Sequence, residues 1–264
     1  MIIEDSIVVF NEQIADGIWK MEVISPKIAE CVKGPGQFVN IDVSVSWEFT
    51  LRRPMSIAGV ENGNLSFIYK IFSEGTKRMS LRKKGDILNM LGPLGNTFQF
   101  NKKDGITSIL IGGGVGIAPI LWLHNLMVEK EIEHSIIIGA VNASGHFMVH
   151  KPEMGVHLTT DDGTLGHRGT VMPTLEEISQ NKNIVKIYAC GPEPMLKAVQ
   201  EFSLTKNIST QLSLESYMAC GTGICQGCII ELKNENPKEH SYHERYSLLC
   251  CDGPVYFADK VIMD

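Results

Sequence analysis

Cysteine is the residue type whose spacing in this chain points most clearly to chemistry. Seven cysteines are present, and five of them fall within residues 220–264. Three follow a C-x4-C-x2-C pattern at Cys220, Cys225 and Cys228, and another stands after 21 further residues, at Cys250. This spacing is typical of plant-type [2Fe-2S] clusters, in which four thiolates hold two irons. The pattern therefore predicts an iron–sulfur site in this part of the chain.

Glycines separate these cysteines, at positions 221, 223 and 227. They let the backbone approach a cluster closely and direct N–H groups toward its sulfur atoms. A structural zinc site is the alternative, but zinc sites usually combine two C-x2-C pairs and this chain offers one. Cys250 and Cys251 are adjacent, and spacing alone does not decide which of them is the fourth ligand.

A glycine-rich segment, Gly112-Gly113-Gly114-Val115-Gly116-Ile117-Ala118-Pro119, follows an apolar run. A turn of this kind between a strand and a helix presents backbone N–H groups to an anion such as a dinucleotide pyrophosphate. It departs from the Rossmann fingerprint because Pro119 stands where the third glycine would be, although proline is tolerated in the first turn of a helix. A plain tight turn is the alternative interpretation.

A second motif, Cys190-Gly191-Pro192, follows another apolar run. Strand, turn and helix in this order place Cys190 at the carboxyl edge of a sheet, where open α/β folds bind ligands. The alternative is a small buried residue before a turn. Two features favour NAD over NADP. The segment Thr160-Asp161-Asp162-Gly163 is acidic, and Arg168 is the single arginine between residues 101 and 212.

Two short motifs stand in the first hundred residues. Arg53-Pro54-Met55-Ser56 leads into an apolar run, and Gly75-Thr76 opens a short helical segment. Arginine and serine on an extended segment can bind a phosphate and a ring edge, and helix-start N–H groups can bind the same phosphate. Surface Arg-Pro pairs are also ordinary, so a structural role is the alternative.

The elements that would position these motifs divide the chain in three. Six short β-type runs up to residue 100 predict a small antiparallel barrel, at 6–10, 18–23, 37–43, 55–60, 65–72 and 87–91. Alternating apolar strands and helices over 101–212 predict a parallel α/β domain, with its first strand at 106–111. Residues 213–264 form a short Gly- and Cys-rich segment with a polar insertion at 233–245, where His240 and His243 are expected to be bystanders.

Composition excludes several classes of protein. The 264 residues are 44% apolar and 20% charged with a net charge of -6, which excludes disorder and gives no basic surface for nucleic acid or anionic membrane. Residues 105–123 lack charge, but glycines and Pro119 interrupt them, so we expect no membrane helix there. The first residues lack an export signal, so we expect a cytoplasmic protein that uses its cysteines for metal rather than disulfides.

Taken in order, these motifs resemble ferredoxin reductase-like flavoproteins, and most closely the electron-transfer subunits of bacterial dihydroorotate dehydrogenase B. The resemblance covers nearly the whole chain and includes G-P-L-G-N at residues 92–96 and E-S-Y-M-A-C-G-x-G-x-C-x-G-C at residues 215–228. Residues 250–256 are similar to the family's C-x-D-G-P-V-F. That similarity implies that Cys250 is the fourth cluster ligand and Cys251 a spacer.

The resemblance implies an FAD-binding barrel at 1–100, an NAD-binding α/β domain at 101–212 and a [2Fe-2S] domain at 213–264. It implies cluster ligands at Cys220, Cys225, Cys228 and Cys250, and a catalytic Cys190 beside the nicotinamide. The residues implied to bind FAD or NAD are Arg53, Pro54, Met55, Ser56, Ile68, Tyr69, Lys70, Gly75, Thr76, Gly112, Gly113, Gly114, Gly116, Pro119, Gly191 and Pro192.

The implied function is electron transfer in pyrimidine biosynthesis. Electrons would pass from an FMN-containing dihydroorotate dehydrogenase catalytic subunit through the [2Fe-2S] cluster and FAD to NAD+, in a heterotetramer of two copies of each subunit. A flavin suits this role because it accepts a hydride and releases single electrons, whereas a cluster carries one. The alternatives are a related NAD(P)H-linked reductase subunit serving ferredoxin, sulfide or sulfite, and a zinc-bound interaction module.

Overall fold

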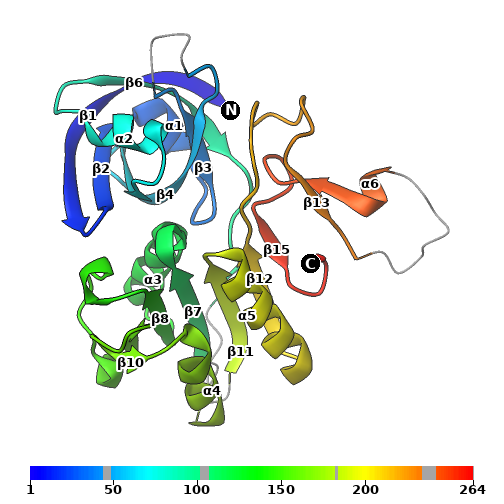
Figure 1. The fold of residues 1–264 in the computed structure, drawn as a ribbon. Coiled ribbons are helices and arrows are strands. Elements are labelled where there is room, and N and C mark those ends of the chain that lie inside the picture. The colour runs from blue at the N-terminus through cyan, green and yellow to red at the C-terminus, as the bar shows by residue number, and fades with distance from the viewer. Residues whose placement is uncertain (44–48, 102–106, 182–183, 234–241, 264) are drawn as a thin grey trace.

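The computed structural model describes residues 1–43, 49–101, 107–181, 184–233 and 242–263. Figure 1 shows three parts: a barrel that contains the N-terminus, an α/β layer below it, and a smaller C-terminal lobe beside both. The predicted class, a barrel followed by a parallel α/β domain and a small C-terminal part, is confirmed. Two predicted features lie outside the described residues, namely Ile106 at the start of a strand and His240 in the polar insertion.

The barrel is closed and antiparallel, with strand order β1-β2-β5-β4-β3-β6. Its strands are β1 (Ile2–Ala15), β2 (Ile18–Ile24), β3 (Phe38–Ile41), β4 (Arg53–Glu61), β5 (Asn64–Lys70) and β6 (Ile87–Leu94). Alternate side chains point inward, so Val39, Ile57 and Phe67 form its fully buried core. Closure removes exposed strand edges, and the six predicted strands are confirmed.

Two short helices accompany the barrel. Helix α2 (Glu74–Ser80) confirms the predicted helical segment and begins one residue before the Gly75-Thr76 pair. Ser73 caps it: the Thr76 hydroxyl accepts from the Ser73 N–H at 3.2 Å. Helix α1 (Pro26–Cys31) was not expected, and Glu4 holds its start by accepting from the Ile28 N–H at 2.9 Å.

The second part is a seven-stranded sheet in the order β10-β9-β8-β7-β11-β12-β15. Its strands are β7 (Thr107–Gly113), β8 (His134–Ala140), β9 (Val156–Thr160), β10 (His167–Arg168), β11 (Ile184–Cys190), β12 (Ser209–Ser213) and β15 (Val255–Phe257). All neighbours are parallel except β15, which runs antiparallel to β12. The helices that cover the sheet are α3 (Ile117–Glu129), α4 (Val171–Asn181) and α5 (Glu193–Lys206), with short turns η1 (Gly114–Gly116), η2 (Ala143–Gly145) and η3 (Pro152–Met154).

The C-terminal lobe is built on a two-stranded sheet. It comprises β13 (Ile229–Glu231), α6 (Tyr242–Arg245) and β14 (Tyr246–Leu248). The chain then returns to the large sheet through β15, so this lobe and the α/β layer share a strand pairing across the division predicted at residue 213. An apolar core joins the three parts, with Phe38 and Leu94 from the barrel, Leu212 from the sheet, and Cys228 and Cys250 from the lobe.

No helix in the described part of the chain combines the length and the apolar character that a bilayer crossing requires.

Candidate cofactor-binding sites

The two barrel motifs, distant in sequence, come together on one surface. Arg53 begins β4, and its side chain lies over the backbone at Gly75, where an added Cβ would be 2.7 Å from the Arg53 Nε. The guanidinium also donates to the Leu51 carbonyl at 2.6 Å and stacks near the ring of Phe49. A fixed, half-buried cation beside a bare glycine backbone suits a phosphate group.

Thr76 contributes to this surface indirectly. It is buried, and its hydroxyl accepts from the N–H groups of Phe72 and Ser73 at 3.1 and 3.2 Å. The hydroxyl therefore holds the turn before α2 in place. The backbone of this turn, rather than the threonine side chain, is what the geometry offers to a ligand.

The predicted contacts on β5 divide between the two faces of the strand. Ile68 packs on the outer side of the barrel against Leu110 and Ile117 of the α/β layer. Tyr69 points into the barrel, where its hydroxyl donates to Asn11 Oδ1 at 2.7 Å and burial raises the pKa of its phenol. Lys70 is exposed. Side chains 68 and 70 can thus face a ligand outside the barrel, whereas residue 69 offers only its backbone.

The glycine loop packs directly on the Cys-Gly-Pro turn. Gly112 pairs with Cys190 in the sheet, and an added Cβ at Gly116 would lie 2.5 Å from the Gly191 N and overlap the Cys190 carbonyl. At Gly113 an added Cβ would be 3.1 Å from the Pro192 ring. The two nucleotide motifs predicted from sequence therefore form one surface at the carboxyl edge of the sheet. Pro119 stands in the first turn of α3, as predicted.

Cys190 lies at the centre of this edge and is only 2% exposed. Burial, with the negative charge of Glu215 as a second cause, raises the pKa of its thiol to about 12. The thiol is therefore protonated at neutral pH and is not a thiolate nucleophile. A small neutral side chain at this position can shape the site for a planar ring.

The acidic turn after β9 keeps its charge. The Asp162 carboxylate accepts from the Thr164 hydroxyl at 2.7 Å and from the Thr164 N–H at 3.0 Å, and these bonds lower its pKa. A negative turn at the sheet edge repels the extra phosphate that distinguishes NADP from NAD. This geometry agrees with the predicted preference for NAD.

The four predicted cluster ligands lie within residues 220–250. The Cys225 N–H points to the Cys220 Sγ at 3.4 Å, and Cys228 and Cys250 are buried, with the Cys250 Sγ 3.6 Å from the Sγ of the exposed Cys251. Among the described residues no three Cys, His, Asp or Glu side chains converge on one point, as a single ion would require. A two-iron cluster takes four thiolates, two on each iron, and these cysteines supply that number.

The loop around Cys220 stabilises a thiolate. Partial burial raises the pKa of the Cys220 thiol, but the N–H groups of Cys225 and Thr222 outweigh it and lower the pKa to about 6. Gly223 has a left-handed φ of +83° and passes so close to Cys251 that an added Cβ would be 2.8 Å from its Sγ. The glycines thus allow the tight loop that a cluster needs.

One residue that sequence reasoning missed lies beneath this loop. Asn40 on β3 is 1% exposed, and among the described residues neither its Nδ2 nor its Oδ1 has a hydrogen-bond partner. An added Cβ at Gly221 would overlap its Nδ2. The available signal was a single amide within the apolar run Phe38-Val39-Asn40-Ile41.

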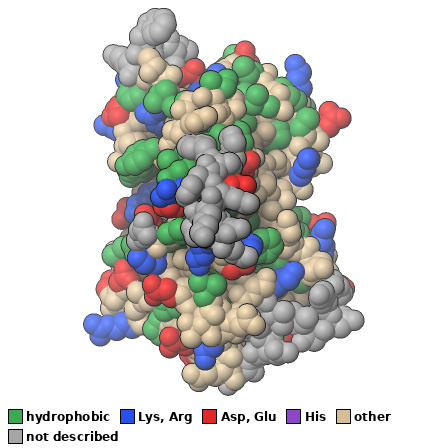
Figure 2. All heavy atoms as spheres, turned by 90° about the vertical axis from the view of Figure 1, so that its right-hand side faces the viewer, with side chains coloured by type: hydrophobic (Ala, Val, Ile, Leu, Met, Phe, Trp, Pro, Cys, Tyr) green, Lys and Arg blue, Asp and Glu red, His purple; other side chains and the backbone are tan. Residues whose placement is uncertain are grey.

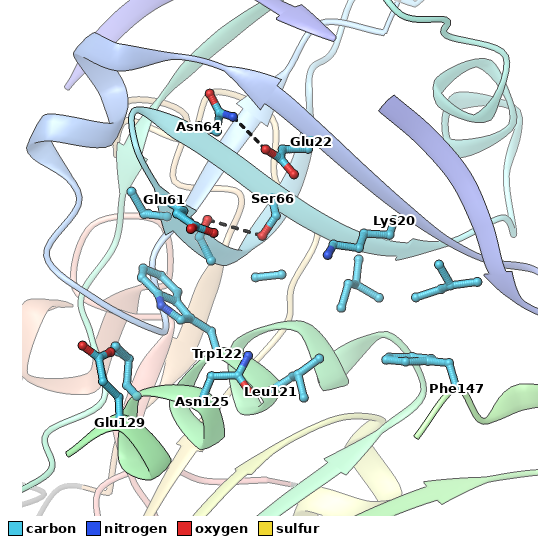
Figure 3. A pocket seen from close by; sticks show the side chains of 16 residues that line it. Lys20, Glu22, Glu61, Asn64, Ser66, Leu121, Trp122, Asn125, Glu129 and Phe147 are labelled. Atoms are coloured by element: carbon cyan, nitrogen blue, oxygen red, sulfur yellow. Dashed lines mark hydrogen bonds between the residues drawn. The ribbon is translucent and has the colours of Figure 1, made fainter. Parts of the chain in front are cut away.

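A cavity of about 810 Å³ lies on another side of the barrel, between β2, β4, β5 and α3. Figure 3 shows Lys20, Glu22, Glu61 and Glu129 around it, together with the indole of Trp122. Three carboxylates against one ammonium disfavour a pyrophosphate. The cavity is therefore a poor match for the phosphates of FAD or NAD, which fit the motif surfaces described above.

The cluster loop is at the molecular surface. Tyr217 and Ile224, on either side of Cys220, are 95% and 84% exposed. Figure 2 views the molecule from the side of the C-terminal lobe and shows hydrophobic side chains on this face, many of them in its upper half, with charged side chains among them. Exposed large apolar residues beside a redox site suit a protein partner.

Two family descriptions match the chain. Residues 215–262 match the iron–sulfur cluster binding domain of dihydroorotate dehydrogenase B, and residues 110–201 match the oxidoreductase NAD-binding domain. The first region contains the cysteine loop and the second contains the glycine loop and the Cys-Gly-Pro turn, whereas the barrel motifs lie outside both.

Solved structures show the same fold. The NADH-dependent reduced ferredoxin–NADP oxidoreductase is 26% identical with a TM-score of 0.83, covering 98% of this chain and 90% of its own. Phthalate dioxygenase reductase, at 15% identity, has a TM-score of 0.63 and covers 94% of each chain.

Curated relatives cover most of the chain. The dihydroorotate dehydrogenase B (NAD(+)) electron transfer subunit of Caldanaerobacter subterraneus subsp. tengcongensis is 40% identical over 230 residues, 86% of this chain and 87% of its own. The subunit of the same name from Fusobacterium nucleatum subsp. nucleatum is 36% identical over 270 residues, 99% of each chain. The chain therefore belongs to the family of dihydroorotate dehydrogenase B (NAD(+)) electron transfer subunits.

Proposed function

We propose that this chain carries electrons between an FMN-containing dihydroorotate dehydrogenase catalytic subunit and NAD+, by way of a [2Fe-2S] cluster and FAD. The bound flavin and cluster supply the conversion between hydride and single electrons. The observation that carries the proposal is the arrangement of the motifs. The phosphate-binding surface of the barrel, the nucleotide edge of the sheet and the cysteine loop belong to parts joined by one apolar core.

Each part has a distinct task in this proposal. Arg53 and the backbone at Gly75 bind the FAD phosphates, with Pro54, Met55, Ser56, Ile68 and Lys70 along the flavin. The loop from Gly112 to Gly116 binds the NAD pyrophosphate, and Gly191 and Pro192 shape the nicotinamide site. Cys190 remains a neutral thiol there, because burial raises its pKa to about 12. It therefore positions the ring and does not act as a nucleophile.

Cys220, Cys225, Cys228 and Cys250 are the proposed cluster ligands. Backbone N–H groups already point at the Sγ atoms of Cys220 and Cys225 in this loop. Such bonds stabilise thiolate charge and help to set the reduction potential of a cluster. We place the protein in the cytoplasm, because clustered cysteines that hold a metal are typical of reducing compartments.

The catalytic partner docks, in this proposal, on the face that carries Tyr217 and Ile224. Their exposure beside the cluster loop supports this choice, since electron transfer requires the partner's flavin to come close to the cluster. A heterotetramer with two copies of each subunit is the assembly we propose. Dihydroorotate binds to the partner.

Co-expression with the FMN subunit tests this function. The complex should purify as one species and reduce orotate with NADH under anaerobic conditions, whereas the FMN subunit alone should not use NADH. The likeness to a ferredoxin–NADP oxidoreductase makes ferredoxin the comparison acceptor. Efficient ferredoxin reduction without complex formation or orotate reduction would replace our proposal with that alternative.

A further inference from the structure

Asn40 is a buried amide whose side chain has no partner in the part of the chain that the structure describes. It is 1% exposed, and neither Nδ2 nor Oδ1 forms a hydrogen bond with the described residues. Its neighbours Val39 and Ile41 point into the barrel core, so strand alternation directs Asn40 outward. Buried side-chain amides nearly always have partners, because leaving them unpaired opposes folding.

The surroundings of Asn40 place it between the two proposed cofactor motifs. Its backbone pairs with Pro54 of the flavin motif across β3 and β4. Its Nδ2 lies against Gly221, the residue after Cys220, so closely that only glycine fits there. Leu94 of the barrel also lies against this glycine, at 3.3 Å from an added Cβ.

The described residues supply no acceptor for Nδ2, whereas a bound cluster would bring several. Thiolate and sulfide sulfur atoms carry negative charge and accept hydrogen bonds. The N–H groups of Thr222 and Cys225 already approach the Cys220 Sγ from within the loop. Asn40 approaches the same region from the barrel.

We infer that the Asn40 Nδ2 donates a hydrogen bond to a sulfur atom of the [2Fe-2S] cluster at its Cys220 end, which ties the cluster to the flavin-binding barrel and raises its reduction potential. A donor stabilises the more negative, reduced cluster more than the oxidised one, so the potential rises. This inference rests on the proposed function, because it requires the cluster in the 220–228 loop.

The test compares Asn40→Leu and Asn40→Ala with the wild-type chain. Both variants remove the donor, but leucine keeps most of the volume and alanine leaves a space. Thr174→Val on α4 is the matched control, since Thr174 Oγ1 is also buried and unpartnered but lies in the α/β layer. The measurements are an anaerobic redox titration of the reduced cluster by electron paramagnetic resonance, the rate of iron release to a chelator, and urea unfolding of the cluster-free chain.

Both Asn40 variants should lower the cluster potential, leave the flavin potential unchanged and release iron roughly tenfold faster, as expected for one lost hydrogen bond to a charged acceptor. The cluster-free Asn40→Leu chain should be at least as stable as cluster-free wild type, because it no longer buries an unpaired amide. Thr174→Val should leave potential and iron release unchanged.

An unchanged cluster potential in both Asn40 variants would overturn the inference while leaving the proposed function intact. A shift in the flavin potential alone would also overturn the inference, because it would assign Asn40 to FAD. A cluster-free Asn40→Leu chain that is clearly less stable than cluster-free wild type would overturn it too, because it would indicate a structural role for Asn40. A wild-type chain that binds no [2Fe-2S] cluster would instead refute the proposed function itself.

Discussion

Replacing Gly116 by alanine tests the contact that forms the proposed NAD site. An added Cβ would be 2.5 Å from the Gly191 N and closer still to the Cys190 carbonyl, so the loop and the turn must separate by at least 0.5 Å to restore even a 3.0 Å approach. Both obstacles are backbone atoms at the end of a buried strand, so neither can rotate away. Overpacking of this kind costs about 1–3 kcal/mol.

The expected result follows from that cost. Gly116→Ala should lower the free energy of unfolding by about 1–3 kcal/mol. If the cost appears in ligand binding instead, NADH affinity should fall by a factor of about 5–150, because 1.4 kcal/mol corresponds to a tenfold change in a binding constant. The assays are urea unfolding and anaerobic NADH titration, with FAD and cluster absorption unchanged because their motifs lie elsewhere.

Gly113→Ala is the matched control for this prediction. Its nearest obstacle is the Met195 Sδ, at 2.7 Å from an added Cβ, which is part of a flexible side chain that can move. Its effect should therefore be smaller than that of Gly116→Ala. Wild-type stability and NADH affinity in Gly116→Ala, or a larger effect at Gly113, would refute the packing described here.

Three further changes separate the remaining assignments. Cys250→Ser should abolish cluster absorption and Cys251→Ser should retain it; the opposite result would make Cys251 the ligand. Arg53→Ala should weaken FAD binding about 10–100-fold, because it loses a charge-assisted phosphate contact, and Arg53→Lys should be intermediate. Equal FAD content in the wild type and both variants would contradict the assignment. Burial, and then the nearby His134, lower the pKa of His124 to about 4, so folding stability should fall as pH drops from about 6.5 toward 4. His124→Gln should remove about 1 kcal/mol of that loss at pH 5.5, allowing for partial exposure, and an unchanged pH profile would exclude His124 as its source.

The barrel and the alternating α/β part could be predicted because their apolar runs are bounded by turn residues and differ clearly in rhythm. Helix α1 (Pro26–Cys31) could not, since six residues are too few to show helical periodicity. Strand β15 (Val255–Phe257) was missed because three residues become a strand only when β12 is beside them. Short elements of this kind depend on tertiary partners rather than on local sequence.

The candidate sites also include parts that the local sequence predicts and parts that depend on the tertiary structure. Residue spacing and family resemblance singled out the cysteine loop, the glycine loop and the arginine motif, and the structure brings Arg53 to Gly75 and Gly116 to Cys190. The inward direction of Tyr69 required the register of the strands. Asn40 acquires its significance only from a loop far away in the sequence, which no local pattern reports.

The central claim is that this chain holds a flavin and a two-iron cluster that exchange electrons with NADH. Protein purified anaerobically should contain about two irons, with matching sulfide, and one FAD per chain. Stoichiometric NADH should bleach the visible absorption of the flavin. Protein that instead contains zinc, or that carries iron and flavin but does not bleach with NADH, would contradict the account.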